Sequence, residues 1–251
     1  MNEEKENEFM KPRRVFSTSS PLIFAVTLIG VILLMGVLFR IENITVIGNE
    51  HYTAQEIINA IDIEEGDNLF FFDRFAAVSR VFAKLPYIEE VTVTRNLPNR
   101  VTIEVTESKA IAYIKLGSEL WTLDHNCKIL GNASEGEEET LIPVTGFDPG
   151  TFYIGETLTT ANGETRPVEF LAAILQQIQD RGMTADVKEI DFSNVNKVLL
   201  KYTDKYQVIL GDPYETEYKF SMVVAAVSQL KEGDIGIIDV SDARSAHFQP
   251  Y

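Results

Sequence analysis

Residues that could carry out nucleophilic, acid–base or metal chemistry are few and widely separated in this sequence. The histidines are His51, His125 and His247, and the single cysteine is Cys127. His125 and Cys127 share one predicted turn, where a Cys–His nucleophile pair is conceivable. A nucleophile and its base usually come from separate segments with a third, orienting group, so a hairpin tip is the favoured interpretation.

Motifs that bind metals or phosphates are missing. The sequence has no H-E-x-x-H and no glycine-rich phosphate loop, and one cysteine cannot build a thiolate site. Acidic pairs such as Glu89-Glu90 carry little information in so acidic a chain. We therefore predict no catalytic residue, no metal and no cofactor, and we expect a protein that is not an enzyme.

The charge of the chain limits its partners. The net charge is −16 with a pI near 4.6, and the acids and bases of residues 1–39 cancel, so the whole excess falls on residues 40–251. Nucleic acid is excluded as an expected partner, because phosphate binding needs a basic surface. With one cysteine, no internal disulfide can form, which in an exported domain favours a bacterial source.

One segment near the N-terminus is long and apolar enough to cross a bilayer. Val15 to Phe39 contains no charged residue, and its densely apolar part begins at Pro21. As a helix that part would span roughly 28 Å, close to the hydrocarbon thickness. We predict a cytoplasmic tail over residues 1–20 and a transmembrane helix over residues 21–39 that contacts the lipid bilayer.

A cleaved signal peptide and a buried core helix are the alternatives for this segment. The apolar run exceeds a typical signal-peptide core, and Leu38-Phe39-Arg40-Ile41 offers no small-x-small cleavage site. It is apolar on every face, whereas a core helix shows one stripe. Lys11, Arg13 and Arg14 precede the span, so the positive-inside rule places residues 41–251 outside the cell membrane.

Residues 41–107 predict a small α+β domain with the order β-α-α-β-β. Ile41 to Val46 alternates like a half-buried strand, and Thr53 with Glu56 matches a capping box before the first helix. Two more alternating runs, Ile88 to Arg95 and Arg100 to Thr106, flank a turn. Three strands with two helices on one face share a single core.

The second helix of this domain follows Asp73 and stops at Pro86. Its inward-facing residues are predicted to be Phe75, Val78, Val81, Phe82 and Leu85. The preceding run Phe70 to Phe72 is either a partner-binding patch or a closure of the core, and core closure is the favoured interpretation.

The amino-acid sequence of this region resembles that of a POTRA domain. Pro86 to Glu107 matches the pattern V-x-V-x-R-x-x-P-x-x-[LV]-x-I-x-V-x-E, which is typical of the FtsQ/DivIB family. The matching residues are Val91, Val93, Arg95, Pro98, Val101, Ile103, Val105 and Glu107. For Arg95 and Glu107 the simpler interpretation is that they solvate the hairpin ends. A POTRA domain directly after one N-terminal anchor resembles FtsQ/DivIB specifically.

Residues 108–251 predict a mixed β-sheet domain with two helices. The helices are expected over about 165–181 and 215–230, and Ile235 to Val240 is expected to be the last strand. This fits the β-rich second domain of the FtsQ/DivIB family. The match departs in two places: Ser241 follows I-D-V where many members have arginine, and the chain stops at Tyr251 where many have a longer tail.

The resemblance implies a non-catalytic scaffold of the division machinery. Members of the family recruit the membrane proteins FtsB/DivIC and FtsL, and through them influence the septal peptidoglycan synthases FtsW and FtsI. It also implies enrichment at the division septum. An exposed strand edge would offer unpaired N–H and C=O groups to such a partner.

The partner-binding edge of the family lies near its C-terminal strand. Mapped here, the candidate residues are Ile238, Asp239, Val240, Ser241, Asp242, Ala243 and Arg244, with Phe248 and Tyr251 as aromatic anchors. For Ile238 and Val240, membership of the core is an equal alternative. Two other functions stay open: a membrane-anchored cell-wall enzyme using Cys127 and His125, and a POTRA-type export chaperone, which would normally show a β-barrel or repeated POTRA domains.

Overall fold

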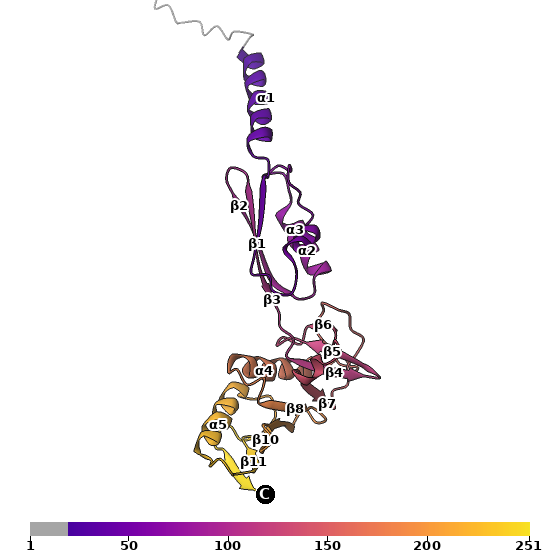
Figure 1. Cartoon of the computed structure of the whole chain (residues 1–251), viewed down its shortest axis with the longest axis vertical. Coiled ribbons are helices and arrows are strands. Elements are labelled where there is room, and N and C mark those ends of the chain that lie inside the picture. The colour runs from indigo at the N-terminus through magenta and orange to yellow at the C-terminus, as the bar shows by residue number, and fades with distance from the viewer. Residues whose placement is uncertain (1–19) are drawn as a thin grey trace, which may run out of the picture.

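The computed structural model describes residues 20–251, and the predicted cytoplasmic tail lies outside the described residues apart from Ser20. A long helix leads into a three-stranded sheet and then a nine-stranded sheet (Figure 1). Each sheet has its own cluster of buried apolar side chains. The predicted α+β class, with an apolar helix, a β-α-α-β-β unit and a mixed sheet with two helices, is confirmed. The exact domain boundaries, 41–107 and 108–251, stay predictions.

The first helix, α1 (Ser20–Leu38), is apolar all round. Its window Pro21–Leu38 has a mean hydropathy of 2.7, and none of that window is buried by the rest of the protein. This exposure rules out a core helix, which would be covered by other elements. A helix of this length and composition fits a single-pass membrane anchor.

The three-stranded unit contains β1 (Asn43–Ile47), α2 (Ala54–Ile61), α3 (Arg74–Lys84), β2 (Ile88–Asn96) and β3 (Arg100–Glu107). The sheet order is β1-β3-β2, with β1 parallel and β2 antiparallel to β3. The alternating residues Val101, Ile103 and Val105 of the central strand are all buried. Helices α2 and α3 cover this face, as the period-two pattern predicts.

The capping box at the start of α2 is present as predicted. The Thr53 hydroxyl accepts from the Glu56 N–H, and the Glu56 carboxylate accepts from the Thr53 N–H at 2.8 Å. The Thr53 hydroxyl also donates to the Glu56 carboxylate at 2.7 Å, and this bond together with that from the Thr53 N–H holds the pKa of Glu56 below its usual range.

The Glu56 carboxyl should therefore titrate at a lower pH than an ordinary glutamate carboxyl. A carboxyl whose folded pKa is depressed adds stability above its unfolded pKa, and that stability is lost as the pH falls through the folded pKa. We expect an NMR titration of Glu56 with a midpoint below the ordinary value of about 4.3. Thr53→Val should raise the midpoint and Thr53→Ser should preserve it; equal midpoints in Thr53→Val and the parent would contradict the capping-box account.

Helix α3 differs from its predicted orientation. Ala77 and Val81 are buried, whereas Phe75 and Phe82 are exposed, so the prediction that these two phenylalanines face inward is wrong. At 100° per residue, positions 75 and 82 share a face that lies opposite Ala77. Small side chains at positions 77 and 81 let α3 approach the sheet, and Leu85 closes its end.

The prediction that Phe70 to Phe72 close the core is also wrong for the first two residues. Phe70 and Phe71 are exposed, and Phe72 is only partly buried. Leu69 fills the core position instead, with no exposed surface. The chain turns at the base of α1, so only one side chain of this run reaches the interior.

The nine-stranded sheet has the order β12-β11-β10-β9-β8-β7-β4-β5-β6. Its elements are β4 (Ala112–Leu116), β5 (Glu119–Leu123), β6 (Ile129–Asn132), β7 (Ile142–Thr145), α4 (Arg166–Asp180), β8 (Val187–Asp191), β9 (Val198–Tyr202), β10 (Tyr206–Gly211), α5 (Thr216–Gln229), β11 (Gly236–Asp239) and β12 (His247–Pro250). A single-turn 3-10 helix spans Glu137–Glu139. Helices α4 and α5 lie against one face of the sheet (Figure 1).

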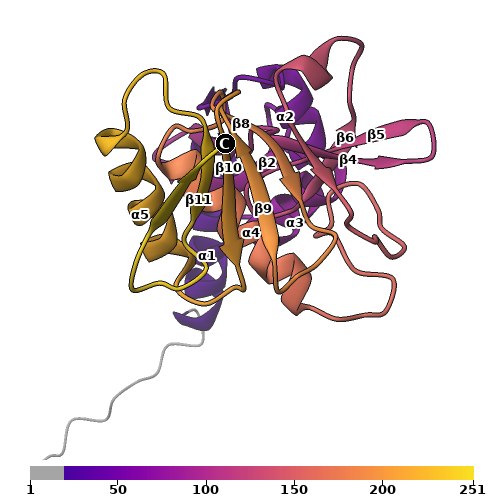
Figure 2. The same cartoon turned by 90° about the horizontal axis from the view of Figure 1, so that it is seen from below.

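One strand in this sheet was not predicted. Ile235 to Val240 is not the last strand, because β12 follows β11 and pairs with it antiparallel. The segment His247-Phe248-Gln249-Pro250 is short, ends in proline and shows no apolar alternation, so the sequence gives no strand signal there. The C-terminus lies at the end of the molecule farthest from α1 (Figure 1), and it faces the viewer when the molecule is seen from below (Figure 2).

Candidate functional site

The outermost strand of the nine-stranded sheet is held by close backbone packing. In the register, Gly236 lies opposite Pro250 and Ile238 opposite Phe248. A Cβ placed on Gly236 would lie 2.2 Å from the Gln249 carbonyl oxygen, so only glycine lets β12 approach this closely. The C-terminal edge is therefore a defined strand rather than a loose tail.

The hydrogen-bond pattern shows which groups of β12 face away from the sheet. The Tyr251 N–H donates to the Ile235 carbonyl at 3.1 Å, which marks these two residues as a hydrogen-bonded pair. Because such pairs alternate along an antiparallel ladder, Gln249 also bonds to β11, whereas the N–H and C=O of Phe248 point outward. Pro250 faces outward too and has no N–H to offer, so Phe248 carries the outward donor in the middle of the strand.

The aromatic candidates lie at this edge. Phe248 is half-buried and packs edge-on against Tyr206, with ring centroids 6.4 Å apart. Tyr251 is 73% exposed at the end of the same strand. Both aromatic candidates thus lie at the free strand edge, with their side chains on opposite faces of the sheet.

The other candidate residues lie in the core, at the end of β11 or in the turn; Asp239 ends β11 and accepts from the Ser241 N–H at 2.9 Å. Ile238 and Val240 have no exposed surface, and both belong to the apolar core, so they cannot touch a partner directly. Ser241 to Arg244 form the exposed turn between β11 and β12. There the Arg244 guanidinium bonds to the Asp242 carboxylate at 3.0 Å and lowers the pKa of that carboxyl. Both partners are exposed, so this pair adds little to stability.

The Cys127 and His125 pair has the wrong environment for nucleophilic catalysis. Cys127 is completely buried, and its Sγ lies 3.8 Å from the Val168 carbonyl oxygen. Burial raises the pKa of the Cys127 thiol well above its ordinary value, whereas a reactive cysteine needs a lowered pKa. The His125 ring instead approaches Glu89 of the other unit, at 3.4 Å.

Asp124, which the sequence did not single out, organises the junction between the two units. Its carboxylate is buried and accepts from the Ser108 hydroxyl at 2.9 Å and from the Asn126 and Lys128 N–H groups at 2.8 Å. The Lys128 ammonium donates to the Ile88 carbonyl at 2.8 Å. One carboxylate therefore fixes both the β5–β6 turn and the linker after β3.

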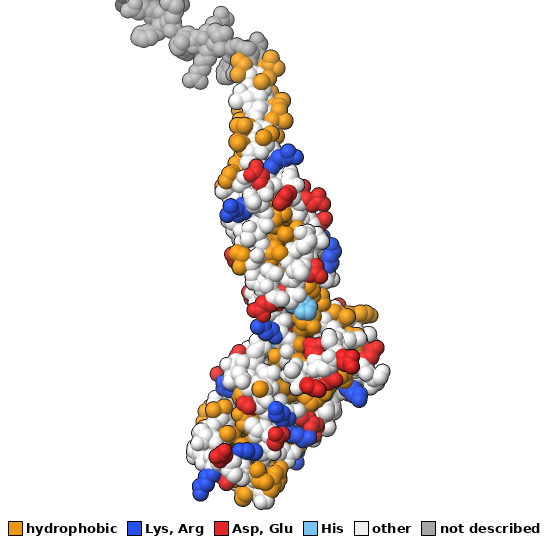
Figure 3. All heavy atoms as spheres, in the orientation of Figure 1, with side chains coloured by type: hydrophobic (Ala, Val, Ile, Leu, Met, Phe, Trp, Pro, Cys, Tyr) orange, Lys and Arg blue, Asp and Glu red, His pale blue; other side chains and the backbone are white. Residues whose placement is uncertain are grey.

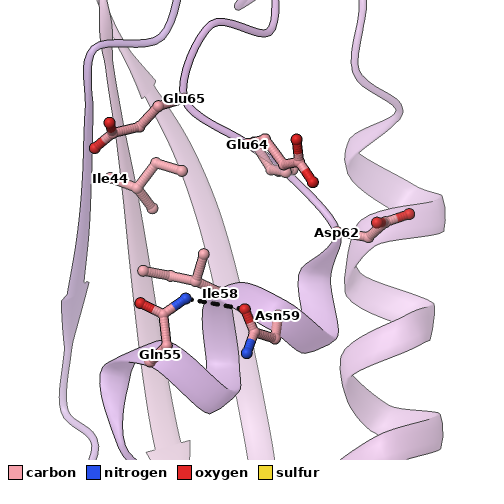
Figure 4. Close-up of a pocket in the computed structure, with 8 residues that line it drawn as sticks. Ile44, Gln55, Ile58, Asn59, Asp62, Glu64 and Glu65 are labelled. Carbon is pink, nitrogen blue, oxygen red and sulfur yellow. Dashed lines mark hydrogen bonds between the residues drawn. The ribbon is translucent and has the colours of Figure 1, made fainter.

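A shallow hollow of about 390 Å³ lies between the free edge strand β1 and helix α2 (Figure 4). Ile44 and Ile58 form its floor, and its rim is polar and acidic: Gln55, Asn59, Asp62, Glu64 and Glu65. In the part of the chain that the structure describes, no group of three or more His, Cys, Asp or Glu residues could hold a metal ion.

These features define a class: an apolar anchor helix that carries a POTRA-like unit and a larger sheet with a free C-terminal edge. A family model described as "POTRA domain, FtsQ-type" matches residues 39–108. This match covers the three-stranded unit from the end of α1 to Ser108.

Proteins named as cell-division proteins match most of the chain. "Cell division protein DivIB" of Clostridium botulinum (strain Hall) is 25% identical over 92% of this chain and 90% of that protein. "Cell division protein FtsQ" of Corynebacterium glutamicum is 27% identical over 84% and 87%. DivIB of Bacillus subtilis (strain 168) is 24% identical over 95% and 85%. The extracytoplasmic domain of DivIB from Geobacillus stearothermophilus aligns with a TM-score of 0.32 at 15% identity, over 50% of this chain and 99% of that domain.

The predicted resemblance is confirmed: the chain is related to the FtsQ/DivIB family of cell-division proteins and contains an FtsQ-type POTRA domain. The names of these relatives support a role in division.

Proposed function

We propose that the chain is a non-catalytic scaffold of the division machinery, which binds other membrane division proteins through the free edge of β12. The observation that carries the proposal is the outward-facing backbone of Phe248 on the outermost strand of the nine-stranded sheet. Unpaired N–H and C=O groups of an edge strand pair readily with an extended segment of another protein.

The chemistry of this edge favours one added strand. Phe248 supplies an outward N–H and C=O, and Pro250 limits the pairing on its C-terminal side because it has no donor. Tyr251 adds an exposed aromatic ring, and aromatic side chains are enriched among residues that dominate binding energy. The turn Ser241 to Arg244 lies at the other end of the strand and provides the polar rim.

The proposed partners are FtsB/DivIC-like and FtsL-like membrane proteins, and through them the septal synthases FtsW and FtsI. With the N-terminus in the cytoplasm, α1 would hold both sheets outside the membrane, at the septum. Strand β12 lies far from α1 (Figure 1), and this position supports an interaction with the extracellular part of a second anchored protein.

Co-purification tests this function. The full chain is co-expressed with a DivIC-like membrane protein, extracted in mild detergent and captured by an affinity tag. We expect the partner to co-elute in comparable amount. A cooperative unfolding transition would show that the purified chain is folded. If this folded chain captures no DivIC-like or FtsL-like protein, the proposal is contradicted.

The enzyme alternative receives no support from the site that would carry it. The Cys127 thiol is buried and has a raised pKa, and His125 contacts Glu89 and Asn126 rather than the sulfur. Turnover of peptidoglycan fragments that disappears on Cys127→Ala would overturn this conclusion. For the export chaperone, the described residues contain one POTRA-like unit and no second copy of it.

A further inference from the structure

We propose that the loop between α2 and α3, together with the first turn of α3, rests in the headgroup region of the outer leaflet of the bilayer that α1 spans. The surface consists of Phe70, Phe71 and Phe75, and we call it the aromatic shoulder. The inference rests on the membrane anchor of the proposed function. It adds a lipid-binding surface that holds the POTRA unit against the membrane.

The loop is fastened to the last turn of α1. The Asn68 side-chain amide donates to the Met35 carbonyl at 3.2 Å, and the Leu69 N–H donates to the Phe39 carbonyl at 2.8 Å. The Phe39 and Phe70 rings meet edge to face, with centroids 4.9 Å apart. These contacts fix the depth of the loop relative to the helix, because Met35 lies one turn before the helix end.

That depth coincides with the membrane boundary. A helix of 19 residues is about 28 Å long and fills a hydrocarbon core of about 30 Å. Its last turn then lies at the outer edge of the hydrocarbon, and Phe70 lies beside it. The next residues of the loop necessarily enter the headgroup region, where aromatic side chains gather in membrane proteins.

The exposure of the aromatic shoulder has no other explanation within the chain. Phe71 and Phe75 are 77% and 76% exposed, the highest values among the large apolar side chains that the structure describes. Single exposed apolar residues are ordinary, but three phenylalanines within six positions, next to a membrane helix, form a patch continuous with an apolar surface. Figure 3 shows the apolar surface of α1 reaching the top of the POTRA unit, where charged side chains of both signs first appear.

Basic side chains surround the aromatic shoulder in a chain that is otherwise acidic. Arg74 lies over the Phe75 ring at 5.3 Å, and Arg95 over the Phe72 ring at 4.6 Å. Two more arginines are exposed at the same end. Arg40 forms a β-bridge with Asn68, and Arg100 pairs with Asn43 at the start of β1. Such guanidinium groups can bind lipid phosphates, because one arginine donates two parallel hydrogen bonds to two oxygens of a phosphate group.

Three of the acids at this end accept hydrogen bonds within the protein. Asp73 accepts from the Phe75 and Ala76 N–H groups as the cap of α3. Asp67 accepts from the Glu64 N–H, and Glu42 from the Asn99 side chain. These carboxylates keep their negative charge, and Glu64 and Glu65 of the same loop are exposed, so the arginines would act through local contacts with lipid phosphates rather than through a net positive charge.

Quenching by brominated lipids tests the proposal. The full chain is placed alone in vesicles of phosphatidylcholine and phosphatidylglycerol with bromine on the acyl chains. Trp121→Phe removes the native indole, and Phe71→Trp introduces one at the aromatic shoulder. We expect this indole to lose about half of its emission, with bromines near the headgroups quenching more than deep ones.

Two matched variants complete the test. Leu28→Trp, within α1, reports whether the helix is inserted and should be quenched by deep bromines. Tyr214→Trp places the indole at a similarly exposed aromatic position, two residues before α5, and this indole should keep its emission. Quenching at 28 without quenching at 71 would overturn the aromatic shoulder and leave the anchor intact. No quenching at either position would refute the anchor itself, and the shoulder with it. A blue-shifted but unquenched indole at 71 would mean that protein rather than lipid covers the shoulder, which also overturns the proposal.

Discussion

Phe248→Pro is expected to weaken binding of a DivIC-like partner roughly 5- to 150-fold relative to Phe248→Ala, since an unmet backbone hydrogen bond costs about 1–3 kcal/mol. Both variants lack the aromatic ring, so their difference isolates the outward N–H of β12. Proline is tolerated on an edge strand where the missing N–H faces away from the sheet. The measurement is the dissociation constant of the purified chain for the partner's extracellular segment.

The position of the proline is the control for folding. Gln249→Pro removes an N–H that faces β11, so it should detach β12 and lower the melting temperature, whereas Phe248→Pro should unfold at nearly the same temperature as Phe248→Ala. Equal partner affinity of Phe248→Pro and Phe248→Ala would show that the partner does not pair with this strand.

Asp124→Ala is expected to cost about 3–5 kcal/mol of unfolding free energy, because the buried Ser108 hydroxyl and the part-buried Asn126 and Lys128 N–H groups lose their acceptor. The carboxylate is 1% exposed, so water cannot replace it without opening the junction. Asp124→Asn keeps one acceptor oxygen for the Asn126 and Lys128 N–H groups and should cost far less. Urea unfolding, followed by tryptophan fluorescence, measures both.

A comparable aspartate outside the junction serves as the reference. Asp191 accepts from the Ser193 N–H in a partly exposed turn, so Asp191→Ala should cost below about 1 kcal/mol. Similar losses for Asp124→Ala and Asp191→Ala would contradict the role of Asp124 as the organiser of the junction.

Much of the fold follows from local patterns. Alternation located β1, β2 and β3, and the capping box located α2. Helical spacing located α4, in which Val168, Leu171, Leu175 and Ile178 are all buried. These patterns depend on neighbours along the chain, so the sequence carries them. The pattern from Pro86 to Glu107 was specific enough to identify the POTRA unit.

The errors come from tertiary packing. Phe75 and Phe82 look like core residues, yet the small residue Ala77 faces the sheet because it lets α3 approach. Strand β12 has almost no signal of its own and exists because Gly236 leaves room for it on β11. Asp124 looked like an ordinary turn residue, and only the fold shows that its carboxylate reaches Ser108.

The location of the candidate site came from the family resemblance, and partner binding there stays a prediction. The sequence pointed to residues 238–251, and the structure places Phe248 and Tyr251 at a free edge while it buries Ile238 and Val240. Which side of a strand faces the core depends on the register with β11, which no local pattern reveals.

The side of the membrane that the C-terminal edge occupies is the most direct test of the whole account. Tyr251→Cys introduces an exposed thiol, while the native Cys127 is buried and provides the background. A membrane-impermeant maleimide added to intact cells should label Tyr251→Cys as fully as it does after lysis, whereas Asn2→Cys should react only after lysis. Labelling of Tyr251→Cys that requires lysis would place the edge in the cytoplasm and contradict a scaffold acting outside the membrane.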